Sequence, residues 1–259
     1  MSAPGRPKRE LQRSAQREAN PTSANTAAGR VPGVDVLRAI ALVAMIGYHF
    51  AFDLRYYGVI RTDFEHDPVC LAVRAAILSS FLLLAGVSLW LADRARVAPM
   101  RFWRHVATIA ACAVLVSVGS YALFPKTYIW FGVLHAIAVA LVLARPCVRR
   151  PALAASIGVV VIVAGVWFRH PAFDTPALGW IGFMTSKPYT EDYVPLFPWM
   201  GVVFLGLALG DLLARRDFAP LAPLAGAPRW FRALGRHTLL IYMVHQPLLL
   251  GALWLALRR

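Results

Sequence analysis

Apolar residues are gathered into seven long runs, separated by shorter polar or basic segments. The runs cover about 34–54, 69–92, 103–124, 128–144, 152–168, 194–214 and 238–256. A helix of about 20 apolar residues crosses the hydrocarbon core of a bilayer, so each run is of spanning or nearly spanning length. The fourth and fifth runs are the shortest. The pattern predicts an all-α polytopic membrane helix bundle with about seven transmembrane helices.

Composition agrees with a membrane protein. Hydrophobic residues make up 59% of the chain and charged residues 15%, and the mean hydropathy is +0.58. Soluble domains contain about 45–50% apolar residues. A net charge of +14 would suggest nucleic-acid binding in a soluble chain, but here the basic residues concentrate in alternate loops. We therefore expect membrane lipid as a partner and no nucleic acid. Three widely spaced cysteines predict neither a metal site nor a structural disulfide.

The basic residues also predict an orientation. Of the 27 Lys and Arg residues, 19 fall on the side of the membrane that holds the N-terminus and seven on the other, with Arg74 inside a run. The positive-inside rule then predicts a cytoplasmic N-terminus and a multi-pass protein of the plasma (inner) membrane. Residues 1–30 are basic and lack apolar periodicity, which predicts a disordered cytoplasmic tail. The transmembrane domain is expected to cover 31–259.

Four ionisable residues share one face of the first run. At 100° per residue, Asp35 and Asp53 project at about the same angle, and His49 and Arg38 lie roughly 40° and 60° away. Because a charge near the bilayer centre costs on the order of 3 kcal/mol, this face should line a protein interior or a wet cavity. An alternative is that Asp35 caps the helix start and Arg38 extends to one interface. His49 and Asp53 would then be solvated at the other interface.

The last run carries a second polar group in the stretch GRHTLLIYMVHQP. Within it, His237 and His245 lie two steps of i+4 apart, with Gln246 adjacent, and Pro247 removes one backbone hydrogen bond. Polar groups inside a membrane need partners. We therefore expect the first and last helices to face a shared cavity that brings His49 and His245 together. A purely structural polar cluster is the alternative.

The segment 170–193 is predicted as the one long loop on the outer side. It carries aromatic residues beside carboxylates, and the outer end of the sixth run follows it. Such a combination binds sugars or amines, although the same residues also suit the membrane interface. The candidate substrate-binding residues are Trp180, Tyr189, Glu191, Asp192 and Trp199.

Several stretches resemble a known superfamily. In LRAIALVAMIGYHF, Arg38 is followed eleven residues later by His49, as in the first helix of the transmembrane acyltransferase superfamily. The stretch GRHTLLIYMVHQP is similar to the late-helix signature of that superfamily. YHFAFDLRYYG and LFPWMGVVFLGLALG resemble bacterial members of the heparan-alpha-glucosaminide N-acetyltransferase catalytic-domain family. The resemblance covers about 34–256, with Ala39 in place of the glycine that usually follows the Arg.

This resemblance implies transfer of an acyl group to an amine or hydroxyl of a glycan or glycolipid on the far side of the membrane. The co-substrate implied is cytosolic acetyl-CoA or another acyl-CoA. His49 would act as the general base or as a transient acyl carrier. The lysosomal enzyme of the family has Asn at this point and a His in its first luminal loop, where this chain has His66. The base thus stays open between His49 and His66.

The residues support the same chemistry. A His that titrates near neutrality suits removal of a proton from an attacking amine or hydroxyl, and Asp53, one turn beyond His49, would orient the imidazole. Arg38 lies about 16 Å along the helix axis from His49, so it is expected to hold a CoA phosphate or a pantetheine amide instead. The candidate cofactor-binding residues are Arg38, Arg236, His237 and His245.

Other functions are also compatible with the pattern. A proton-coupled transporter or exporter would use His49, Asp53 and Arg74 as a relay, but the runs show no internal repeat of the kind that many transporters carry. A non-catalytic membrane scaffold is a further alternative. A homodimer is compatible with each of these functions. Binding of acetyl-CoA separates the acyltransferase from the transporter and the scaffold.

Overall fold

The computed structural model describes residues 30–257, and within them every regular element is a helix. The predicted tail, 1–30, lies outside the described residues except for Arg30. The α-helices are α3 (Pro32–Tyr56), α4 (Pro68–Arg94), α5 (Pro99–Leu123), α6 (Val133–Ala144), α7 (Pro151–Trp167), α8 (Leu196–Ala214), α9 (Arg229–Arg236) and α10 (Thr238–Leu257). The 3-10 turns are η1 (Arg145–Cys147), η2 (Pro171–Phe173), η3 (Gly179–Ile181) and η4 (Ala219–Gly226).

Each of the seven apolar runs forms a helix. By length and hydropathy, α3, α4, α5, α8 and α10 are able to cross a membrane, whereas α6 and α7 have only 12 and 17 residues. Proline in the first turn of α3, α4, α5 and α7 marks where these helices begin, because the missing N–H costs no helical hydrogen bond there. The predicted all-α membrane fold is confirmed, with five helices of spanning length in the described residues. The count of about seven spans and the orientation stay predictions.

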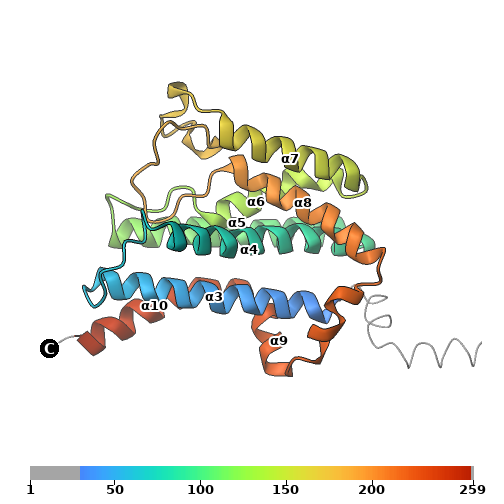
Figure 1. The fold of residues 1–259 in the computed structure, drawn as a ribbon, viewed down its shortest axis with the longest axis horizontal. Coiled ribbons are helices and arrows are strands. Elements are labelled where there is room, and N and C mark those ends of the chain that lie inside the picture. Colours follow the sequence, from blue (N-terminus) through green and yellow to red (C-terminus); the bar gives the residue numbers. More distant parts are fainter. Residues whose placement is uncertain (1–29, 258–259) are drawn as a thin grey trace, which may run out of the picture.

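The helices form two groups that face each other (Figure 1). In one group α8 packs against α4, α6 and α7, and in the other α3 packs against α9 and α10. The α4–α8 contact is close because glycines meet there. A Cβ atom on Gly206 would lie 2.2 Å from the carbonyl oxygen of Leu83 and 3.0 Å from the Cα of Gly86. Contacts between α3 and α4 join the two groups.

The last apolar run is preceded by a separate short helix. The chain leaves helical geometry at His237 (φ −102°, ψ 23°), and Thr238 Oγ1 donates to the carbonyl of Gly235 at 2.8 Å, which closes the end of α9. His237 therefore lies outside the helix that carries His245, and its side chain is exposed. The prediction that His237 and His245 lie at i+4 steps of one helix is therefore wrong.

Candidate functional site

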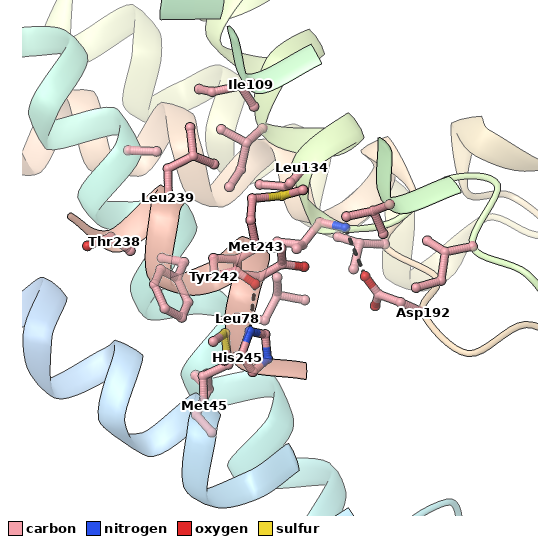
Figure 2. A pocket seen from close by; sticks show the side chains of 18 of the residues that line it. Met45, Leu78, Ile109, Leu134, Asp192, Thr238, Leu239, Tyr242, Met243 and His245 are labelled. Atoms are coloured by element: carbon pink, nitrogen blue, oxygen red, sulfur yellow. Dashed lines mark hydrogen bonds between the residues drawn. The ribbon is translucent and has the colours of Figure 1, made fainter. Parts of the chain in front are cut away.

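A cavity of about 890 Å³ lies among α3, α4, α5, α6 and α10. Figure 2 shows part of its wall, where one labelled apolar residue comes from each of these helices: Met45, Leu78, Ile109, Leu134 and Met243. The first and last helices thus face a common cavity, as their polar faces predicted. Its volume lies within the range of about 300–1,000 Å³ that is usual for small-molecule sites.

Polar side chains of α3 and α10 meet in this cavity. The rings of His49 and His245 have centroids 5.1 Å apart. One turn further along α3, Asp53 Oδ1 accepts a hydrogen bond from Gln246 Nε2 at 2.8 Å. Asp53 is only 2% exposed, so the alternative in which it is solvated at an interface is wrong. Among the described residues its hydrogen-bond partner is Gln246, so the predicted contact with His49 is not formed.

The backbone determines the tautomer of His245. Its Nδ1 lies 2.6 Å from the carbonyl oxygen of Tyr242 (Figure 2). A carbonyl only accepts, so Nδ1 carries the hydrogen and Nε2 of the neutral ring carries the lone pair. This Nε2 is buried without a partner in residues 30–257, as are Asp53 Oδ2 and Gln246 Oε1. Three buried acceptors on residues of the cavity wall suit a bound molecule that donates hydrogen bonds.

Basic side chains gather at one end of the cavity, here called the arginine end. They are Arg38, Arg101, Arg145 and Arg236. Arg38 Nη1 lies 3.5 Å from Asp35 Oδ1, and its Nη2 donates to Ser88 Oγ. Arg236 Nε lies 3.6 Å from the second oxygen of Asp35, so this buried carboxylate joins α3 to α9. Asp35 makes no capping hydrogen bond, and the capping alternative is wrong. Arg38 and Arg236 thus line the cavity, and their binding role stays a prediction.

Arg145 is a residue that the sequence interpretation missed. Its guanidinium lies 4.0 Å from the centroid of the Phe102 ring and 5.6 Å from that of Trp103, contacts that hold its plane in place. Its Nη1 is buried and has no hydrogen-bond partner in the described residues. Its position at the end of an apolar run was a signal in the sequence, but the positive-inside rule alone accounts for an Arg at that position. A phosphate or carbonyl oxygen of a ligand would satisfy this nitrogen.

The opposite end of the cavity, here called the loop end, joins α4 to the long 170–193 loop. Its charged residues include Arg74, Lys187, Glu191 and Asp192. Asp192 Oδ2 accepts from the backbone N–H of Val133 at 3.0 Å (Figure 2), and its Oδ1 lies 3.8 Å from Arg74 Nη2. Burial raises the pKa of Asp192, and the charge of Arg74 opposes this shift. Two of the predicted substrate-binding residues, Glu191 and Asp192, therefore line the cavity.

The remaining predicted site residues lie outside this cavity, and their roles stay predictions. His66 is exposed in the loop before α4, where its Nδ1 lies 3.0 Å from Asp63 Oδ2. Tyr189 is 83% exposed. The Trp180 ring lies tilted beside that of Phe131, with centroids 5.9 Å apart, and Trp199 lines a second, smaller cavity.

These features define a polytopic helical membrane protein whose bundle encloses a largely apolar cavity with polar side chains on its wall. Residues 30–247 match the family model described as heparan-alpha-glucosaminide N-acetyltransferase, catalytic. The chain belongs to this family, as its motifs suggested, and the membership indicates a membrane acetyltransferase. The matched range includes His49, Asp53, His245 and Gln246. Comparisons with curated proteins and with solved structures give no match.

Proposed function

We propose that this protein transfers an acetyl group from acetyl-CoA to an amine or hydroxyl of a glycan or glycolipid. The donor would bind at the arginine end and the acceptor at the loop end. The observation that carries the proposal is one cavity of about 890 Å³ that is lined by the arginine end, by the His49 and His245 pair and by the loop end. Two substrates entering from opposite ends would meet at the histidines.

The arginine end suits a donor with several phosphates. Arg145 has an unsatisfied buried nitrogen, and Arg38 and Arg236 share a single carboxylate, Asp35. Guanidinium groups bind phosphate through charge-assisted, often paired hydrogen bonds. Acetyl-CoA would supply an acyl group activated as a thioester. If the arginine end faces the cytoplasm, as the charge distribution predicts, the donor would come from the cytosol.

The histidines suit the proton transfer that the reaction requires. His49 takes a proton from the acceptor nitrogen or oxygen while that atom forms a bond to the acyl carbon. The carbon–sulfur bond breaks, and the proton then passes from His49 to the departing sulfur. Nε2 of His245, together with the free oxygens of Asp53 and Gln246, accepts hydrogen bonds from the acceptor and positions it.

Binding of acetyl-CoA to the purified protein tests the proposal. We expect saturable binding by isothermal titration calorimetry, and about 10- to 100-fold weaker binding after Arg145→Gln, because a hydrogen bond to a charged group is worth roughly 1.5–3 kcal/mol. Arg104→Gln is the matched control. Arg104 is an exposed residue of α5, the helix that carries Phe102, and it does not line the cavity. A wild-type protein without saturable binding would refute the acyltransferase and favour the transporter or the scaffold.

A further inference from the structure

A second cavity of about 330 Å³ adjoins the loop end. The start of α4, the residues after α7, the long loop and the start of α8 form its wall. Its charged lining residues are all basic: Arg74, Arg169 and Lys187. The lining also contains the hydroxyl groups of Thr185 and Ser186 and the aromatic rings of Tyr193 and Trp199. No lining residue is acidic, and Asp192, which lies outside the lining, pairs with one of the three cations, Arg74.

Contacts position two of the three cations of this cavity, Arg169 and Arg74, whereas the third, Lys187, is exposed. Arg169 Nη1 donates to the carbonyls of Gly165 at 2.5 Å and Phe168 at 2.8 Å, which anchors the guanidinium at the end of α7. The side chain of Arg74 is 32% exposed, and its carboxylate neighbour, Asp192, lies at 3.8 Å. The guanidinium groups of Arg169 and Arg74 therefore lose little freedom when an anion binds.

The second cavity shares part of its wall with the main one. Arg74, Leu78 and Lys187 line both. A molecule with an anionic group in the second cavity would therefore have its neighbouring atoms at the loop end of the main cavity. This is the end at which the proposed acceptor binds.

We propose that the second cavity binds a phosphate ester of the acceptor. Three cations match a phosphate monoester, which carries about two negative charges at neutral pH, better than a carboxylate or a sulfate ester with one. The rings of Tyr193 and Trp199 provide apolar faces for the carbons of an attached sugar. The inference rests on the proposed acetyl transfer and narrows its acceptor to a phosphate-bearing glycan or glycolipid.

Binding of glucose 1-phosphate to the purified protein in a neutral detergent tests this inference, with glucose as the uncharged control at matched ionic strength. We expect calorimetry to detect glucose 1-phosphate and not glucose. Arg169→Gln and Lys187→Gln should each weaken the binding by about tenfold or more, the usual worth of a charge-assisted contact. Arg61→Gln is the matched control, because Arg61 is an exposed cation of the loop before α4 that lines neither cavity.

Several results would overturn the phosphate subsite. They are equal binding of glucose and glucose 1-phosphate, unchanged binding in Arg169→Gln, or loss of binding in Arg61→Gln as well. A response to phosphatidic acid in nanodiscs without one to glucose 1-phosphate would identify the cations as contacts for lipid headgroups. Competition between glucose 1-phosphate and acetyl-CoA would show that the donor occupies this cavity. Acetyl-CoA binding is measured on the same preparations. Loss of glucose 1-phosphate binding with intact acetyl-CoA binding would refute the phosphate subsite alone, whereas absence of acetyl-CoA binding would refute the proposed transfer.

Discussion

The contact between α4 and α8 differs in kind from the contact between α3 and α10. In the first, Gly86 and Gly206 let two backbones approach, and the side chains around them are apolar. In the second, Asp53 binds Gln246 and His49 lies beside His245, and buried acceptors have no partner in the described residues. Unsatisfied buried polar atoms cost about 1–3 kcal/mol each. The first contact thus suits maintenance of the fold, and the second suits binding of the ligand proposed above.

The largest expected effect is on activity, at the polar contact. His49→Ala should lower acetyl transfer by a factor on the order of 100 to 10,000, the usual worth of a positioned base. Since the ring of His49 contacts Tyr48 and His245 without a hydrogen bond in the described residues, the melting temperature and acetyl-CoA binding should stay near the wild-type values. Steady-state transfer rates and a thermal melt of the same preparation measure the two effects.

His66→Ala provides the control for this substitution. His66 is exposed and pairs with Asp63 outside the main cavity, so transfer should continue at close to the wild-type rate. If His66→Ala abolished transfer while His49→Ala did not, the base would lie in the loop before α4. A melting temperature that fell together with activity in His49→Ala would instead assign a structural role to the histidine pair.

A smaller effect is expected on stability, at the glycine contact. Gly206→Ala should lower the free energy of unfolding by about 1–3 kcal/mol, because overpacking forces two helices apart. The matched variant is Gly47→Ala on α3, where an added Cβ meets no atom within 4 Å; it should be neutral or stabilising by up to about 1 kcal/mol. Thermal melts in detergent measure both. Equal losses in the two variants would show that the α4–α8 contact is not the tighter one.

The smallest effect is expected in the long loop, outside both helix contacts. Asp174 accepts hydrogen bonds from Thr185 Oγ1 at 2.5 Å and from Thr185 N–H at 2.8 Å, and these bonds lower the pKa of its carboxyl group. A lowered pKa in the folded state contributes stability above the ordinary value, about 3.9, which is lost as the pH falls through the lowered pKa. The melting temperature of Asp174→Asn should therefore lie below that of the wild type at pH 7. The difference should close below about pH 4, and a constant difference would contradict the assignment.

The helical membrane fold and the α3 side of the cavity were predictable from the sequence, because lipid restricts where charged residues lie. The stripe of Asp35, Arg38, His49 and Asp53 on one helical face indicated a cavity, and the structure places Arg38, His49 and Asp53 on its wall. Local periodicity carries that information, since a charged face must turn away from hydrocarbon. The roles of these residues in catalysis are not determined by their positions.

Other features depend on contacts between distant segments, which periodicity does not report. The break at His237 accompanies close packing of α9 on the start of α3, where a Cβ on Gly235 would lie 1.8 Å from the Asp35 carbonyl oxygen. The fourth run was predicted from 128, but α6 begins at Val133. The preceding residues pair with the long loop instead: the Glu191 N–H donates to the Thr127 carbonyl at 2.8 Å, and the Val194 N–H to that of Phe131 at 3.1 Å.

The apolar residues of the cavity wall bear on the permeability of the membrane. Along α3, Met45 lies between Arg38 and His49; along α4, Leu78 lies between Arg74 and Ser88. Ions that passed these apolar residues would shed their hydration shell, at a free-energy cost of many kcal/mol. A thioester and an acetyl group are uncharged and enter such a region readily. If the protein transfers an acyl group as proposed, this wall would admit the group while opposing the passage of protons and ions.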